Sequence, residues 1–307
     1  MKKRVKRNDS AHILTVRSKG EKAFFGVVFI LFVIYAASLI LPFIFLIINS
    51  LKDGMEYIEH MASGNMVKLP AVWHFGNYIK AFSDMSVIDS LGKEIHLPMM
   101  FLNSLWYCTL STVSGVFASA LTAYVLAKYK FFGRGFFYGI AIFSMTIPVI
   151  GTTAAMFKLV YSFRIYNTPI LPVLLNFAGF GFNFLILYGF FSNLSWSYAE
   201  AVFIDGGGHA TAFFRVMLPQ AFPCLLTLFI MAFITNWNDY TTLLLYMPDY
   251  PTLASGVYGI QQSLSRDGLK YPEYFAGLII AIVPVLILFS VFSETIMSNL
   301  TVGGLKG

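Results

Sequence analysis

Long apolar segments alternate with polar loops along this 307-residue chain, and they constrain its fold more than any other feature. A helix of about 20 apolar residues is long enough to cross a bilayer. Because the hydrocarbon core holds no water, each such segment must satisfy its backbone polar groups internally, which favours a helix. The spans are predicted at about 23–48, 97–127, 136–161, 168–191, 220–246 and 274–292. We therefore predict an all-α, polytopic membrane protein with six transmembrane helices.

The basic residues predict the orientation of these helices in the cell membrane. Lys and Arg concentrate in the cytoplasmic loops of membrane proteins. Eight of the 21 Lys and Arg residues precede the first apolar segment. With both termini in the cytoplasm, 13 of them lie inside and eight outside, whereas the inverted topology reverses that bias. The predicted division is a cytoplasmic N-terminal basic segment (1–22), a transmembrane domain (23–300) and a cytoplasmic tail (301–307).

The composition and the absence of certain motifs exclude several function classes. The net charge of +6 does not indicate a nucleic-acid partner, because the basic residues cluster before the first helix as a topology signal. No G-x-x-x-x-G-K-[ST] loop occurs, so the chain by itself cannot be interpreted as an ATPase. No Cys and His spacing is typical of a metal site, and the five histidines are scattered through polar segments. We therefore expect no catalytic residues, no metal and no cofactor bound by this chain.

A polar cluster, Asn236-Trp237-Asn238-Asp239, interrupts the fifth apolar segment. A carboxylate at bilayer depth costs roughly 2.5–3.5 kcal/mol on insertion scales, so Asp239 is expected to face water or the protein interior. Three interpretations remain open. The four residues form part of an interfacial belt, line a solute passage that binds hydroxyl groups, or bind neighbouring helices.

The loop between the fourth and fifth spans, 194–219, contains the clearest local signals in the chain. The segment from Trp196 to Ile204 is expected to form a short helix, and the three glycines that follow allow a sharp bend. Asp205 is a candidate cap for a second helix from Ala210 to Leu218. Pro219 suits the first turn of the fifth span. The loop therefore predicts a bent helix pair presented to a groove in another protein.

These residues resemble the EAA loop of ABC importer permeases, whose pattern is E-A-A-x-x-D-G-A with an L-P dipeptide downstream. The residues that carry the resemblance are Glu200, Ala201, Asp205, Gly206, Phe213, Leu218 and Pro219. Val202 and Gly207 depart from the pattern, because each stands where the family has Ala. The resemblance implies that this set, with Gly207, couples the chain to a separate ATPase, in which a basic residue faces Glu200.

Shorter matches extend the resemblance over most of the chain, to carbohydrate-importing permeases similar to the second membrane subunit of the maltose system. They are Ser50-Leu51-Lys52, Asn77-Tyr78, Asn103-Ser104-Leu105, Ala123-Tyr124, Phe132-Gly133-Arg134, Trp237-Asn238 and Gly303-Gly304-Leu305-Lys306-Gly307. They are in the order and at the spacing of that branch. The resemblance implies a type I ABC importer permease fold and the import of a sugar, an oligosaccharide or a related polyol.

The same resemblance implies the partners of the chain. They are a second homologous permease, two ABC ATPase subunits that hold ATP and Mg²⁺, an extracellular solute-binding protein, a carbohydrate and the lipid bilayer. Two other classes of protein account for the sequence less completely. A self-sufficient secondary transporter or channel accounts for six helices but not for the loop 194–219. A membrane enzyme is not supported, because the sequence contains no constellation of catalytic residues.

Overall fold

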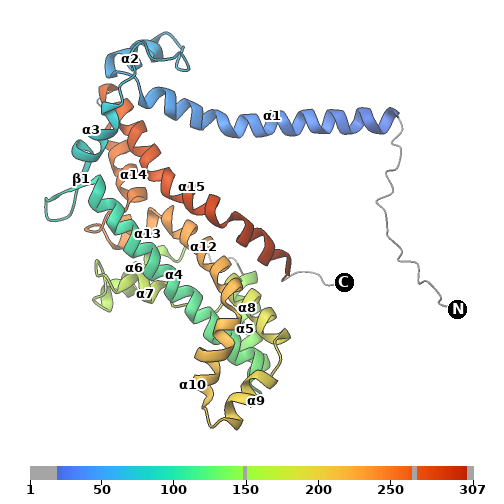
Figure 1. The fold of residues 1–307 in the computed structure, drawn as a ribbon. Coiled ribbons are helices and arrows are strands. Elements are labelled where there is room, and N and C mark those ends of the chain that lie inside the picture. The colour runs from blue at the N-terminus through green and yellow to red at the C-terminus, as the bar shows by residue number, and fades with distance from the viewer. Residues whose placement is uncertain (1–18, 148–150, 265–267, 303–307) are drawn as a thin grey trace.

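The computed structural model describes residues 19–147, 151–264 and 268–302. Helices dominate these residues, as predicted, and their only strands form one small antiparallel hairpin that the sequence did not predict (Figure 1). Most of the predicted basic segment 1–22, and residues 303–307 of the predicted tail, lie outside the described residues.

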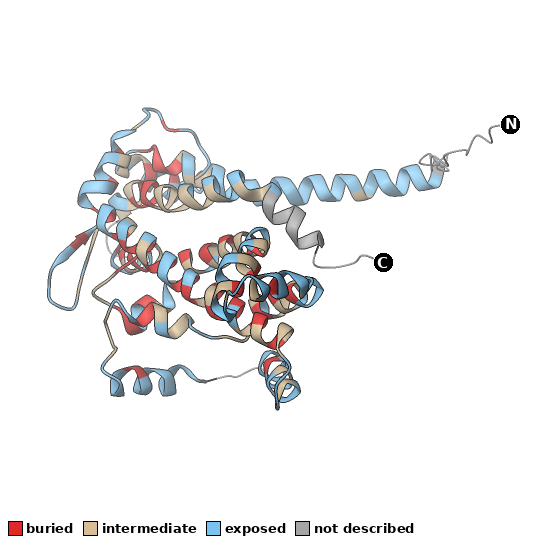
Figure 2. Ribbon diagram, turned by 60° about the horizontal axis from the view of Figure 1, so that its bottom comes forward, coloured by how far each residue is buried: buried red, intermediate tan, exposed pale blue. Residues whose placement is uncertain are grey.

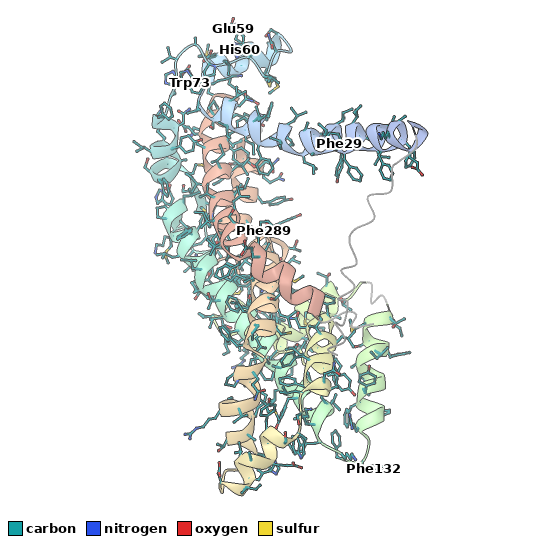
Figure 3. All side chains as sticks on the ribbon, turned by 45° about the vertical axis from the view of Figure 1, so that its right-hand side comes forward. Phe29, Glu59, His60, Trp73, Phe132 and Phe289 are labelled. Atoms are coloured by element: carbon teal, nitrogen blue, oxygen red, sulfur yellow. The ribbon has the colours of Figure 1, made fainter. Side chains whose placement is uncertain are left out.

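The first helix, α1 (Lys19–Ser50), extends away from the other helices for most of its length (Figure 1). Its apolar side chains are exposed along this length, and Phe29 has 69% of its surface accessible (Figures 2 and 3). Only the end near Ser50 packs on the rest of the chain, where the ring of Phe45 lies 5.8 Å from that of Phe275. A helix that is apolar on every side is typical of a helix surrounded by lipid or by other membrane helices.

Three long helices form the centre of the molecule. α4 (Leu97–Lys128) packs against α12 (Phe222–Trp237), and α12 packs against α15 (Tyr271–Val302) (Figure 1). α8 (Phe182–Asn193) also packs against α4 and contacts α12. The start and end of α4 agree with the predicted second span to within one residue.

The structure divides the third, fourth and fifth predicted spans into pairs of shorter helices. The pairs are α5 (Arg134–Thr146) with α6 (Thr153–Ser162), α7 (Leu171–Asn176) with α8, and α12 with α13 (Thr241–Tyr246). The break between α7 and α8 ends at Gly181, whose φ of 141° belongs to a region that favours glycine. Apolar composition alone does not reveal such breaks, because both halves of a broken span remain apolar.

Among the described residues, three helices are long and apolar enough to cross a membrane. They are Gly20–Ser50, Leu97–Lys128 and Gly268–Glu294. A fourth results if the bent pair His209–Gln220 and Phe222–Trp237 is counted as one span. The chain is therefore a multi-pass membrane protein by its helices, and the count of six crossings remains a prediction.

Short elements form the end of the molecule opposite the loop 194–219. They are α2 (Gly54–Ala62), α3 (Gly76–Asp84), β1 (Ser86–Ile88), β2 (Glu94–His96), α14 (Leu253–Leu264) and the 3-10 turn η2 (Gly268–Lys270). The strands pair with Val87 opposite Ile95. Figure 3 labels Glu59, His60 and Trp73 here, which we call the α2 end, and Phe132 near the opposite, loop end.

Two of the short motifs that carried the resemblance meet at the α2 end. The Asn77 side-chain amide donates to the backbone carbonyls of Ser50 and Lys52, both at 2.8 Å. The Tyr78 hydroxyl lies 2.9 Å from that of Ser50. Lys52 is fully buried, and its Nζ donates to Asn49 Oδ1 at 2.8 Å, while burial lowers the pKa of this ammonium group. These motifs therefore fix the chain at the end of α1.

Candidate functional site

The loop at the end opposite α2 contains the predicted helix. α9 (Ser197–Ile204) confirms the expected boundaries to within one residue. Its inner face is anchored by Ala199, which is fully buried, whereas Glu200 and Ala201 are exposed. Ile204, one turn after Glu200, is 86% exposed although it is large and apolar. No described residue forms an ion pair with Glu200. α9 therefore presents an unpaired carboxylate beside an exposed apolar side chain.

The bend after α9 depends on two of the three glycines. Gly206 adopts φ +82°, a left-handed conformation that costs other residues roughly 1–2 kcal/mol. Gly207 has an ordinary φ, but a Cβ on it would lie 2.6 Å from Cγ1 of Val202. Gly208 meets neither constraint, because its φ is −93° and nothing lies within 4 Å of the place that a Cβ would take. The bend is therefore specified by Gly206 and Gly207.

Asp205 does not cap the helix that follows, so that prediction was wrong. It is the C-cap residue of α9, and its backbone N–H donates to the carbonyl of Ala201 at 3.0 Å. The residue that precedes α10 (His209–Thr211) is Gly208, which has no side chain with which to cap it. Because the glycine bend separates Asp205 from α10, its exposed carboxylate stays free to meet a partner.

The chain returns from the loop through an irregular helix. α10 continues into a π-helical segment, η1 (Ala212–Met217), and a short turn, α11 (Leu218–Gln220). Pro219 lies at the start of α11 and is exposed, but the fifth span proper begins only at Phe222, after a bend of 74°. The expectation that Pro219 opens the fifth span is therefore corrected. Single π-helical turns are frequent at functional sites.

Two members of the predicted set serve packing rather than the surface. Phe213 is 3% exposed, and its ring lies 4.9 Å from the ring of Tyr124 on α4. Leu218 is half-buried. These side chains attach the returning helix to α4, while Glu200, Ala201, Asp205 and Gly206 remain on the surface.

The end of α4 anchors the loop through Lys128 and Tyr129, two residues that belong to none of the motifs in the sequence. Lys128 Nζ donates to the carbonyl of Leu194, at the end of α8. The hydroxyl of Tyr129 lies 2.9 Å from Nδ1 of His209, and its ring packs edge-on against Trp196. A cation beside the final carbonyls of a helix is favourable, because those carbonyls carry partial negative charge. The position of Lys128, directly after a predicted span, was the only signal available.

A cavity of about 390 Å³, open to the surface of the chain, lies between α4, the α7–α8 connection and α12. Its polar lining residues include Ser111, Thr112, Ser119, Asn176, Asn183 and Asn236. Asn236 donates from its side-chain amide to Thr112 Oγ1 at 3.0 Å, a bond that joins α12 to α4. The predicted polar cluster therefore reaches this cavity through Asn236.

The other members of that cluster point elsewhere. Trp237 is 4% exposed, and its indole N–H donates to the carbonyl of Ala281 in α15 at 3.1 Å. Asp239 accepts from the Tyr107 hydroxyl and from the backbone N–H of Thr242, both at 3.0 Å. Asn238 is exposed and donates back to the Ile234 carbonyl in its own helix. Among these residues, helix-to-helix contacts account for Trp237 and Asp239.

A cluster of three hydrogen-bonded polar residues, Ser90, Asn167 and Asp249, joins three segments of the chain at the α2 end. Asp249 accepts from the Ser90 backbone and hydroxyl and from the Asn167 side-chain amide. The Asn167 side chain in turn accepts from the backbone N–H of Asp249 at 3.2 Å. Because Asn167 has φ +56°, which residues other than glycine seldom adopt, this cluster holds its backbone in an uncommon conformation. The hydrogen bonds from Ser90, with that from Asn167, lower the pKa of the Asp249 carboxyl.

The long apolar helices, the cavity among them and the exposed loop define a multi-pass membrane protein. The family model described as "binding-protein-dependent transport system inner membrane component" matches residues 111–301, more than half of the chain. The chain belongs to this family, and the membrane location follows from it.

Relatives and a solved structure agree with this assignment. The chain is 29% identical over 291 residues to the diacetylchitobiose uptake system permease protein of Streptomyces coelicolor, covering 93% of this chain and 90% of that protein. It is 25% identical over 303 residues to the maltose/maltodextrin transport system permease protein of Escherichia coli, covering 95% and 99%. The crystal structure of a bacterial ABC transporter that imports the acidic polysaccharide alginate matches with a TM-score of 0.70 at 21% identity, covering 91% of this chain and 98% of that one. The last match supports the fold.

Proposed function

We propose that this chain is a permease subunit of an ABC importer that moves a carbohydrate into the cell. The observation that carries the proposal is the similarity over nearly the full length of both chains to permeases of diacetylchitobiose and maltose systems. The family match favours this function over a self-sufficient secondary transporter or channel, because the family consists of components that work with a binding protein.

The proposed topology has six membrane crossings with both termini in the cytoplasm. α1, α4 and α15 each form one crossing, and the broken pairs α5–α6, α7–α8 and α12–α13 supply the other three. The loop end then faces the cytoplasm and the α2 end faces outward. The concentration of basic residues before α1 and after α4 supports this orientation.

The loop 194–219 is the proposed coupling element. Glu200 is exposed and unpaired, so it is available to a basic residue of an ATPase subunit. Ile204 is available to an apolar part of the same groove. Lys128 and Tyr129 attach the loop to α4, so a displacement of α9 by the ATPase is passed to the helices that surround the cavity. Such rigid-body motion is a common form of switching.

The proposed complex contains a second homologous permease, two ATPase subunits and an extracellular solute-binding protein. ATP and Mg²⁺ bind to the ATPase subunits and not to this chain, which contains no phosphate-binding loop. The carbohydrate passes among the membrane helices, and of the predicted passage residues Asn236 is the one that lines the cavity.

Co-purification and uptake test the proposal together. The tagged chain, expressed with its genomic neighbours, is expected to bring down an ATPase and a second permease, and cells that lack the chain are expected to lose uptake of a carbohydrate. Retained uptake of every carbohydrate tested, or purification without any ATPase, would contradict the proposal.

A further inference from the structure

We propose that the cavity between α4, α7–α8 and α12 binds a neutral carbohydrate, and that Ser111 donates or accepts a hydrogen bond to it. This inference rests on the proposed function, and it specifies the charge of the substrate and the residue that contacts it. The relatives leave the charge open, because the matched systems include one for diacetylchitobiose and one for an acidic polysaccharide.

The first observation is an unused hydroxyl. Ser111 is 1% exposed, it lines the cavity, and its Oγ has no hydrogen-bond partner among the described residues. The Tyr107 hydroxyl, one turn earlier in α4, donates its proton to Asp239, and its contact with the Ser111 hydroxyl does not have the geometry of an ordinary hydrogen bond. A buried polar atom without a partner is rare in folded proteins and calls for a ligand or another specific cause. A hydroxyl group of a sugar is a suitable partner, because it both donates and accepts.

The second observation is the arrangement of small residues along α4. Ser111, Gly115 and Ser119 follow one another at intervals of four, which places them on one face of the helix, and all three line the cavity. A Cβ on Gly115 would lie 3.2 Å from the carbonyl oxygen of Asn176, so the α7–α8 connection approaches α4 closely at this point. The cavity is thus bounded by backbone on one side and by hydroxyl groups on the other, and its exposed lining residues Ala178, Phe182 and Thr235 leave it open to the surface of the chain.

The third observation is the absence of charge. None of the described residues that line the cavity is Lys, Arg, His, Asp or Glu, whereas several carry hydroxyl or amide groups. A buried carboxylate or sulfonate requires a cationic partner, and this lining offers none. Hydroxyl and amide groups without charge are suited to a neutral polyhydroxylated ligand.

The cavity is large enough for a small ligand. Its volume of about 390 Å³ lies in the range of roughly 300–1,000 Å³ typical of small-molecule sites. The Asn236 side chain uses its NH₂ group to donate to Thr112. Its side-chain carbonyl oxygen, Oδ1, therefore remains available as an acceptor. The cavity therefore offers hydrogen-bond donors and acceptors from α4 and α12, the two helices that this bond connects.

The test uses the complete transporter in proteoliposomes with its binding protein and ATP. Uptake is measured for a neutral panel (maltotriose, diacetylchitobiose and arabinotriose) and an acidic panel (trigalacturonate and trimannuronate). We expect uptake from the neutral panel. We also expect Ser111→Ala to raise the KM for uptake by roughly three- to tenfold, the effect of one lost hydrogen bond. The melting temperature is expected to stay unchanged or to rise, because Ser111 Oγ has no partner among the described residues.

Two further variants make the result interpretable. Ser119→Ala probes the same face two turns away and is expected to raise KM as well. Thr109→Val is the control, since Thr109 is exposed and bonds only to the Leu105 carbonyl of its own helix, and its KM is expected to match the wild type.

Each other outcome contradicts the inference in a recognisable way. Uptake of the acidic panel alone, or an unchanged KM in both Ser111→Ala and Ser119→Ala, overturns the neutral-sugar site while the proposed importer function stands. A lower melting temperature for Ser111→Ala with an unchanged KM assigns Ser111 to packing and also overturns it. Uptake of neither panel overturns the site, and it overturns the carbohydrate function as well if no other sugar or polyol is taken up.

Discussion

Val202 occupies the space that a side chain on Gly207 would need. Cγ1 of Val202 lies 2.6 Å from the position of a Cβ at residue 207, well inside contact distance, and the Val202 carbonyl lies 3.0 Å from it. These are the two positions at which the loop departs from the E-A-A-x-x-D-G-A pattern. The larger residue at one position is accommodated by the smaller residue at the other, so the two departures compensate each other.

Gly207→Ala is therefore expected to destabilise the loop by roughly 1–3 kcal/mol, the usual effect of overpacking. The double variant Val202→Ala with Gly207→Ala restores the family pattern and is expected to recover most of that loss. Thermal unfolding of the purified protein measures both effects. Gly208→Ala is the matched control, because no atom lies within 4 Å of its Cβ position, and it should behave as the wild type. Additive effects of the two substitutions would contradict the compensation.

Glu200→Lys is expected to reduce transport-coupled ATP hydrolysis by roughly tenfold or more, because it places a cation against the proposed basic residue of the ATPase. Glu200→Gln keeps the size of the side chain and should cause a smaller loss. The ATPase rate of the assembled transporter, with and without loaded binding protein, measures the effect. Both variants should reach the membrane in normal amounts, since Glu200 is exposed and forms no ion pair with a described residue. Normal coupling in Glu200→Lys would refute the assigned role.

Lys128→Met is expected to loosen the attachment of the loop to α4 by roughly 0.3–2 kcal/mol, because it removes the cation from the final carbonyls of α8. We expect ATP hydrolysis to become less dependent on loaded binding protein, since motion of α9 would reach α4 less directly. Lys130→Met is the control, because Lys130 is exposed on the same segment. Equal coupling ratios in the two variants would show that Lys128 does not position the loop.

Trp237→Phe is expected to lower thermal stability by about 1 kcal/mol without changing the KM for uptake, because its indole bonds to Ala281 in α15 and its side chain is buried. Asn238→Ala is the comparison, since Asn238 bonds only within its own helix, and it should leave both quantities near the wild type. A raised KM with unchanged stability in Trp237→Phe would contradict this expectation and indicate that Trp237 lines the solute passage.

Asp249 predicts a pH dependence at the α2 end. The folded-state pKa of its carboxyl lies below the ordinary value of 3.8, so the ionised form stabilises the fold. This contribution is fully present above about pH 4 and is lost as the pH falls through the lowered pKa. The melting temperature of Asp249→Asn should therefore lie below that of the wild type at about pH 7 and approach it under more acidic conditions. Asp84→Asn, an exposed carboxylate on α3, is the control and should show no such convergence. A constant difference at every pH would contradict the role of the Asp249 charge.

The sequence alone determined the long helices and the helix and bend of the loop 194–219. α1, α4 and α15 were predicted because an apolar segment longer than the bilayer thickness has one stable solution in lipid, which is a helix. α9 and its bend were predicted because Gly206 and its neighbours have local conformational preferences that act over a few residues. These signals are local, so they can be recognised without knowledge of the fold.

The tertiary structure decided which residues meet. Ser111 and Asn236 are 125 positions apart, and they line one cavity only because α4 packs against α12. Trp237, adjacent to Asn236, bonds instead to α15. The breaks within three apolar segments were likewise not predictable, because composition does not reveal them. In a membrane helix nearly every face is apolar, so periodicity does not indicate which face is buried against which neighbour. That choice depends on the packing of whole helices, and it separates the cavity-lining Asn236 from the packing residues beside it.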